Sequence, residues 1–127
     1  MDNKKEVFKY IEKKYKAKPE YLWRRFPNYA IFRHSDNKKW FSLIMDVEKK
    51  KLGLVGETRV YILNIKIDDA EFRDALICKK GYFKGYHISR GNWVTVLLDG
   101  TVELKEICNL IDISFLSTAP KKRKRVK

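Results

Sequence analysis

The chain has 127 residues, 44% of them hydrophobic and 13% aromatic, with only 6 Gly and 3 Pro, which suits one folded domain and excludes a second. Its net charge of +13 indicates a polyanionic partner, because excess Lys and Arg attract phosphate backbones through a long-range field. No apolar run approaches the ~18 residues of a membrane span, and residues 1–6 enter a helix instead of a signal-peptide core, so we expect a cytoplasmic protein with no membrane partner.

The first expected element is an amphipathic helix over residues 3–15. Its apolar side chains recur at helical spacing, at Val7, Phe8, Ile11 and Tyr15. Lysines occupy another side of the same helix, at positions 9, 13 and 16. The apolar stripe therefore needs a sheet to cover, and the outer face of the helix is basic.

Three short runs rich in aromatic residues come next, over residues 21–23, 29–33 and 40–47. Pro, Asn, Asp and Ser residues separate them, and this alternation of apolar runs with turn residues predicts a β-meander. Residues 48–58 contain lysines and glycines and are expected to form an irregular loop. The loop leads into another predicted strand at residues 59–66.

The second half of the chain begins with a predicted short helix that follows an N-cap at Asp68-Asp69 and stops at Gly81. Residues 81–93 are too rich in glycine and polar groups to predict a regular element. A strand is expected from Trp93 to Leu98, closed by an Asp-Gly turn.

A last helix is predicted to open at Thr101 or Val102 and to bury apolar side chains spaced at i, i+3, i+4, i+7 and i+11 from Leu104. We expect its outward side to be acidic, with Glu103, Glu106, Asn109 and Asp112. The predicted order α-β-β-β-β-α-β-α contains no series of βαβ units. It favours an α+β fold of two layers, an antiparallel sheet of about five strands with helices packed on one face.

No motif of a catalytic, cofactor or metal site is found, so we expect a protein that is not an enzyme and binds no cofactor or metal. His34 is expected to be an exposed residue at a strand end. His87 lies in the irregular loop, where a structural role is favoured over contact with a ligand or phosphate. Cys78 and Cys108 lie in apolar patterns and are expected to be buried and reduced.

Four segments in the same order resemble the MmcQ/YjbR family. They are Lys39-Trp-Phe-Ser-Leu-Ile-Met, Tyr61-Ile-Leu-Asn-Ile-Lys66, Gly85-Tyr-His-Ile-Ser-Arg-Gly-Asn-Trp93 and Val96-Leu-Leu-Asp-Gly-Thr101. Members of that family show a Lys-Trp-Phe strand, an Asn-Leu-Lys strand, a Pro-x-Tyr-His-Met-Asn-Lys-x-x-Trp segment and a Leu-Asp-Gly-Ser turn. Their last helix has Leu-Ile-x-x-Ser-Tyr, which is here Leu110-Ile-Asp-Ile-Ser-Phe115.

The resemblance implies a two-layer α+β fold similar to that of secretion chaperones, and a bacterial family that is commonly labelled DNA-binding. The chain departs from the family pattern at Lys84, where proline is usual, and at Ile67, where cysteine is frequent. Ile88 and Ser89 replace Met-Asn, and Arg90 keeps the charge of the usual lysine.

Nucleic-acid binding is the first functional hypothesis, with DNA favoured over RNA. Basic residues of the domain, with His87 beside them, are expected to contact phosphates from loops and strand ends, at Arg24, Arg25, Lys38, Lys39, Lys84, His87 and Arg90. Three neighbouring aromatic residues, Tyr82, Phe83 and Tyr86, are candidates for stacking on unpaired bases. In the alternative interpretation these aromatic side chains belong to the core and the lysines form a solvated face.

The chain is expected to divide into a domain, residues 1–118, and a disordered basic tail, residues 119–127. Six of the positive charges lie in residues 121–127, which leaves +7 for residues 1–120. The tail residues expected to contact phosphates are Lys121, Lys122, Arg123, Lys124, Arg125 and Lys127. The domain itself is therefore basic.

Two other hypotheses stay open. One is a protein-interaction adaptor, or chaperone-like module, that binds an acidic protein partner or forms a homodimer. The other is a binding site for a small ligand, or an enzyme active site, centred on the loop that contains His87.

Overall fold

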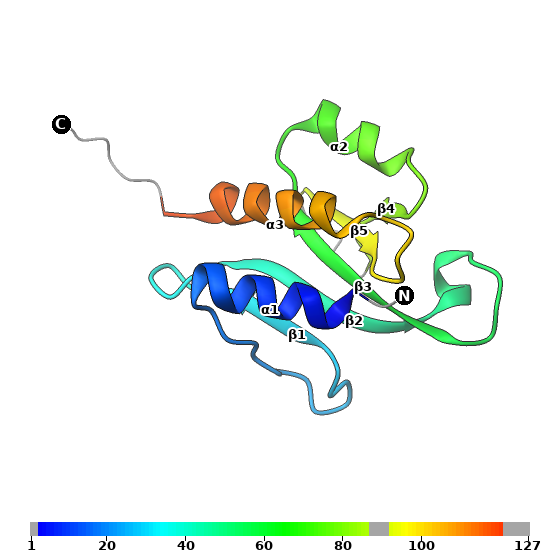
Figure 1. Cartoon of the computed structure of the whole chain (residues 1–127), viewed down its shortest axis with the longest axis horizontal. Helices are drawn as coiled ribbons and strands as arrows, with labels where there is room; N and C mark the ends of the chain where they lie inside the picture. The colour runs from blue at the N-terminus through cyan, green and yellow to red at the C-terminus, as the bar shows by residue number, and fades with distance from the viewer. Residues whose placement is uncertain (1–2, 87–91, 121–127) are drawn as a thin grey trace.

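The computed structural model describes residues 3–86 and 92–120, and within these ranges the chain forms a five-stranded antiparallel sheet and three α-helices (Figure 1). The helices are α1 (Lys4–Tyr15), α2 (Ala70–Ile77) and α3 (Leu104–Thr118), with a short 3-10 helix, η1 (Lys49–Leu52). The strands are β1 (Ala30–Arg33), β2 (Trp40–Glu48), β3 (Arg59–Lys66), β4 (Tyr82–Lys84) and β5 (Trp93–Leu97). Their order across the sheet is β1-β2-β3-β5-β4.

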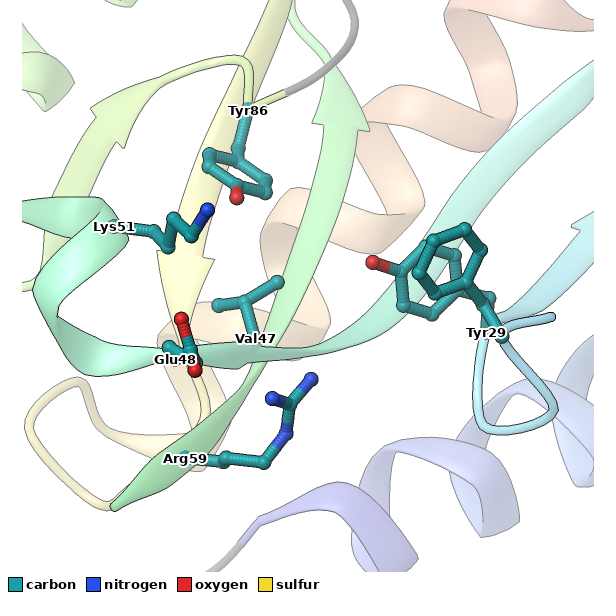
Figure 2. A pocket seen from close by; sticks show the side chains of 7 residues that line it. Tyr29, Val47, Glu48, Lys51, Arg59 and Tyr86 are labelled. Carbon is teal, nitrogen blue, oxygen red and sulfur yellow. The ribbon is translucent and has the colours of Figure 1, made fainter. Parts of the chain in front are cut away.

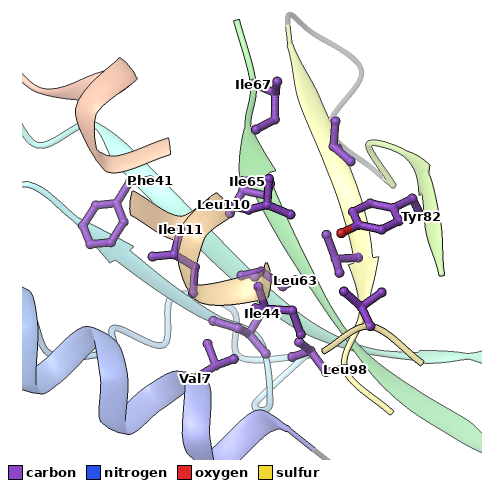
Figure 3. Close-up of a cluster of buried hydrophobic side chains, with 14 of the residues drawn as sticks. Val7, Phe41, Ile44, Leu63, Ile65, Ile67, Tyr82, Leu98, Leu110 and Ile111 are labelled. Atoms are coloured by element: carbon purple, nitrogen blue, oxygen red, sulfur yellow. The ribbon is translucent and has the colours of Figure 1, made fainter. Parts of the chain in front are cut away.

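All three helices contribute buried side chains to the main core on one face of the sheet, α2 by Leu76 alone. Figure 3 shows this core beside α1 and α3. Val7 and Ile11 of α1 and Ile111 of α3 are fully buried against strand residues such as Ile44 and Leu63. Side chains alternate between the two faces of a strand, so the continuous apolar runs of β2 and β3 supply a second apolar face as well. The expected α+β architecture of two layers is confirmed.

The second face of the sheet has its own apolar cluster, made by Ile31, Leu43, Met45, Val47, Val60, Ile62 and Leu97. No α-helix of the described residues packs on it. Instead it is covered by side chains from the loop between α1 and β1, from η1 and its flank, and from β4 and the residues after it. Because loops cover this face, it is the more irregular surface of the molecule.

Ser114 of α3 joins β2 to β3 where their pairing stops. The ladder between these strands ends at Leu43 and Asn64. Beyond it, the Ser114 hydroxyl donates to the carbonyl of Phe41 at 2.7 Å and accepts from the backbone N–H of Lys66 at 2.8 Å. This contact satisfies two backbone groups that lie beyond the end of the β2–β3 ladder. The same region contains an irregularity, since Phe32 pairs with Ser42 but Arg33 pairs with Trp40.

The acidic side of α3 points outward only in part. Glu103 and Asn109 are exposed as expected, whereas Asp112 and Glu106 are engaged by neighbouring elements. Asp112 accepts hydrogen bonds from the hydroxyls of Tyr10 and Tyr15 and from the ammonium of Lys14, which ties α3 to α1. Burial alone would raise the pKa of Asp112, but these hydrogen bonds outweigh it and lower the pKa. Glu106 is held in the same way, by Tyr82 and Lys79.

Four element predictions were wrong. The short helix after Asp69 ends at Ile77 and does not continue to Gly81. Residues 21–23 are not a strand. A turn follows them at Arg24-Arg25, and it is Glu20 that pairs, through an isolated bridge, with Ile31. Residues 82–84 form the edge strand β4, where irregular structure was expected. The last helix begins at Leu104, after the expected start, with Glu103 as N-cap. The N-cap at Asp69 is confirmed, since its carboxylate accepts from the N–H of Phe72.

The environments of two side chains also differ from expectation. His34 is only 5% exposed, and its Nε2 lies 2.8 Å from the Thr118 hydroxyl, so it links the β1–β2 turn to the end of α3. Cys78 is exposed because it follows the last turn of α2, whereas Cys108 is partly buried; both are free thiols. None of the helices within residues 3–86 and 92–120 has the length and apolar character needed to cross a membrane.

Candidate functional site

Four aromatic rings lie in a row on the second face of the sheet, next to β1. Trp40 contacts Trp23 edge to face at a centroid distance of 5.7 Å, and Trp23 contacts Tyr29 at 5.8 Å in the same manner. Tyr29 in turn stacks on Phe26 at 4.7 Å. We call these four side chains the aromatic row. Phe26 is 46% exposed, so the end of the row is open to solvent.

Two consecutive turns place the row. The N–H of Phe26 donates to the carbonyl of Trp23 at 3.1 Å, and the N–H of Tyr29 donates to the carbonyl of Phe26 at 3.1 Å. The first turn presents Arg24 and Arg25, both exposed. Two guanidinium groups therefore emerge from the same loop as three rings of the aromatic row.

The row ends at a pocket of about 250 Å³ on the same face (Figure 2). It is lined by Phe26, Tyr29, Val47, Glu48, Lys51, Arg59 and Tyr86. Val47 and Glu48 come from β2, with Val47 on the floor. The other side chains converge from the α1–β1 loop, from η1, from β3 and, in Tyr86, from the segment that follows β4. The pocket thus combines aromatic walls with charged groups of both signs.

Asp46 fixes two walls of the pocket at once. Its carboxylate accepts from the Asn28 amide at 3.2 Å and from Nε of Arg59 at 2.9 Å, and its backbone carbonyl accepts from the Arg59 guanidinium at 2.8 Å. The hydrogen bond to Asp46 raises the pKa of Arg59. Burial, together with the nearby Tyr86 hydroxyl, raises the pKa of Tyr29. Both residues therefore keep their protons at neutral pH.

A buried polar network positions Tyr86. Asn64 of β3 is fully buried, and its side-chain oxygen accepts from the hydroxyl of Thr95 while its amide contacts the sulfur of Met45 at 3.3 Å. The Thr95 hydroxyl in turn accepts from the N–H of Tyr86 at 2.8 Å. The chain therefore leaves β4 and bends over the second face, which brings the Tyr86 ring to the pocket (Figure 2).

The structure brings together only some of the residues expected to contact phosphates. Arg24 and Arg25 lie beside the aromatic row. Lys38 and Lys39 are exposed in the β1–β2 turn, directly before Trp40, and the contact between Trp40 and Trp23 joins this turn to the Arg24-Arg25 loop.

Lys84 is exposed on β4, at the opposite edge of the sheet, and does not belong to this group. His87, Arg90 and residues 121–127 lie outside the described residues. The described chain ends at Pro120, close to the Lys38-Lys39 turn, because the Asn37 amide donates to the carbonyl of Thr118 at 2.9 Å.

The aromatic candidates named from the sequence were mostly the wrong ones. Tyr82 is 4% exposed and hydrogen-bonded to Glu106, and Phe83 packs on the second face, so neither presents a free ring; Tyr86 alone reaches the pocket. The missed residues are Trp23, Phe26, Tyr29, Trp40, Lys51 and Arg59. The signal for Trp23, Phe26 and Tyr29 was the density of aromatic residues around Arg24-Arg25, which the sequence analysis assigned to two strands and the turn between them.

Metal-ligating side chains do not gather in the described part of the chain, where no group of three or more His, Cys, Asp or Glu residues is placed to hold an ion. A second concave site lies at the other end of the sheet, between the loop after η1 and the Asp99-Gly100 turn, with a volume of about 180 Å³. Its lining includes no row of aromatic rings, and the pocket beside Phe26 is the better candidate.

Comparisons with known proteins find matches to this chain both by sequence and by fold. A model of the YjbR family matches residues 12–117. The uncharacterized protein YyaQ of Bacillus subtilis is 41% identical over 115 residues, which cover 91% of this chain and 97% of YyaQ.

Two solved structures share the fold of this chain. A crystal structure of a protein from Pseudomonas syringae superposes with a TM-score of 0.88 at 42% identity, covering 92% of this chain and 99% of that one. A protein from Deinococcus radiodurans shares the fold, with a TM-score of 0.64 at 20% identity over 92% of this chain and 78% of that one.

Proposed function

Since the chain belongs to the YjbR family, we propose that it is a non-enzymatic nucleic-acid-binding protein of the cytoplasm that prefers DNA to RNA. The observation behind this proposal is the aromatic row with Arg24 and Arg25 beside it, on a chain with a net charge of +13. Two free cysteines support a reducing compartment.

Arginine and aromatic side chains are the groups that nucleic acids bind best. A guanidinium grips a phosphate through two parallel hydrogen bonds, and a ring stacks on any base regardless of its sequence. Here Arg24 and Arg25 are exposed and three rings of the row come from the same loop. A strand that followed the row would place its phosphates within reach of both arginines.

A second group of charges extends this surface. The Lys38-Lys39 turn adjoins Trp40 at the other end of the row, and the described chain ends near that turn, just before the six positive charges of residues 121–127. In this proposal the Lys38-Lys39 turn and the tail attract the phosphate backbone without reading the sequence.

A binding role without catalysis is supported by the state of His34. Its ring is buried against Phe41 and Phe115 and contacts the Thr118 hydroxyl, so it serves the fold. Burial lowers the pKa of this imidazole, which keeps it neutral near pH 7.

The protein-interaction adaptor is favoured by a different observation. Tyr21 and Leu22 are 56% and 49% exposed and lie in the same loop as Phe26, and exposed apolar side chains in a cluster are typical of protein interfaces. A homodimer or an acidic protein partner would cover them. Asp112 and Glu106 of α3 give such an interface little support, because they already pair with Lys14 and Lys79 within the chain.

Titration of labelled duplex DNA against salt tests the proposal. With residues 120–127 deleted, the four cations Arg24, Arg25, Lys38 and Lys39 predict a slope of about −3 to −4 for the logarithm of the binding constant against the logarithm of salt concentration. The full chain should show a steeper slope, because the tail releases further counterions. No binding of the full chain at low salt would refute the nucleic-acid proposal, and a dimer or a co-purified acidic protein would then favour the adaptor.

A further inference from the structure

We infer that the pocket beside Phe26 holds one unpaired base of a single nucleic-acid strand, preferably a base with an exocyclic amino group. This inference rests on the proposed function and goes beyond it, because contacts to phosphates alone would not distinguish single strands from duplex. Its basis is the size, wall chemistry and charge of the pocket.

The size of the pocket limits its occupant. Sites for drug-sized ligands enclose about 300–1,000 Å³, and this pocket encloses about 250 Å³. A base in a paired and stacked duplex could not enter it, because the base must leave the helix to expose its face. A flexible single strand can turn one base into the pocket at little cost.

The walls of the pocket suit a flat aromatic group. Phe26 and Tyr29 are stacked with an angle of 13° between their rings, and together they form one side. Tyr86 reaches in from the segment that follows β4, and Val47 lies between them on the sheet (Figure 2). A planar group on this floor would contact ring faces or edges from two directions.

The charges favour a base in the pocket over a phosphate. The positive charges of Lys51 and Arg59 are balanced by two carboxylates. Glu48 lies in the lining, and Asp46 accepts a hydrogen bond from Nε of Arg59. The pocket is therefore close to neutral. Glu48 can only accept hydrogen bonds, so it favours the exocyclic amino groups of cytosine, adenine or guanine over thymine, whose only base donor is the ring N–H at N3.

The pocket is continuous with the aromatic row, which indicates where the rest of the nucleic-acid strand would lie. Phe26 belongs both to the row and to the pocket, and Arg24-Arg25 precede it in the chain. A base held against Phe26 would leave its phosphates outside the pocket, on the side of the two arginines. The row then supplies stacking positions for neighbouring bases, as in proteins that bind single strands.

Fluorescence anisotropy with labelled oligo(dC), oligo(dT) and a duplex of equal length tests this inference on the full chain. We expect oligo(dC) to bind more tightly than oligo(dT). The variant Phe26→Ala should weaken oligo(dC) binding roughly 5- to 150-fold, the loss that corresponds to one stacked base, and should change duplex binding far less. Glu48→Ala should remove the preference for oligo(dC) over oligo(dT).

Two controls separate this inference from the proposed function. Tyr21→Ala removes an exposed ring of the same loop that lines no part of the pocket, and it should leave oligo(dC) binding unchanged. Thermal unfolding of each variant verifies that it is folded. If Phe26→Ala and Tyr86→Leu both fold and bind oligo(dC) as tightly as the parent while the duplex still binds, the pocket inference is wrong and the proposed function stands. If neither DNA binds, both are wrong.

Discussion

Replacing Ser114 with alanine removes one oxygen atom and leaves two backbone groups without a partner. The side chain is 0% exposed, and its hydroxyl donates to the carbonyl of Phe41 and accepts from the N–H of Lys66. A buried polar group left unsatisfied costs about 1–3 kcal/mol, and one of the two groups lies near the surface. We therefore expect Ser114→Ala to lower the free energy of unfolding by about 2–4 kcal/mol.

Urea unfolding followed by circular dichroism measures this loss. Ser117→Ala, in the same helix but facing a less buried environment, is the matched control and should change stability by less than about 0.5 kcal/mol. A loss below about 1 kcal/mol for Ser114→Ala, with an unchanged dependence on urea, would show that water or a shifted strand satisfies both groups. The link that we assign to Ser114 would then be wrong.

Three further outcomes are expected. Burial lowers the pKa of His34, so the unfolded chain binds more protons and the free energy of unfolding should fall as the pH drops below about 6.5; His34→Gln should flatten this part of the profile, and an identical profile would contradict the assignment. Asp112→Ala should cost about 1–3 kcal/mol in urea unfolding, because it removes the acceptor that joins α1 to α3, and no loss would refute that role. A thiol reagent should modify Cys78 quickly and Cys108 slowly, since burial raises the pKa of the Cys108 thiol; equal rates, measured with Cys78→Ser as reference, would contradict this.

Regular elements with strong periodicity were predictable from the sequence. The helix over residues 3–15 and the strands over residues 40–47 and 59–66 are confirmed within one residue at each end. Their apolar side chains repeat at the spacing of one element type, and burial of that pattern dominates local preferences. The helix N-cap at Asp69 was predictable for a local reason, because the carboxylate of one residue accepts from a backbone N–H in the first turn of the helix.

The loop before β1 could not be predicted in this way. Its rings are held by each other and by side chains far away in the sequence, as in the contact of Trp23 with Trp40 and of Asn28 with Asp46. Such contacts depend on the completed sheet, and an aromatic run by itself equally indicates a strand. The engagement of Asp112 could not be predicted for a related reason, since only the packing of α1 brings Tyr10 and Tyr15 to it.

Several residues of the family motifs serve the fold. Ser114 bridges Phe41 and Lys66, and each of these three residues lies in a different motif of the resemblance. Asn64 holds Thr95, which positions Tyr86. Shared motifs of this kind specify the architecture, and a function must be argued from the surface beside them. The surface from which we propose a function is the aromatic row with Arg24 and Arg25.

A comparison of two charge-matched double variants tests the central claim most directly. Arg24→Gln with Arg25→Gln and Lys5→Gln with Lys9→Gln remove the same charge, but the second pair lies on α1, on the other side of the sheet. In a DNA titration against salt, the account predicts that the arginine pair lowers affinity and reduces the salt slope by about 2, while the lysine pair leaves both nearly unchanged. Equal losses from the two variants would contradict it, because binding would then depend on total charge and not on this surface.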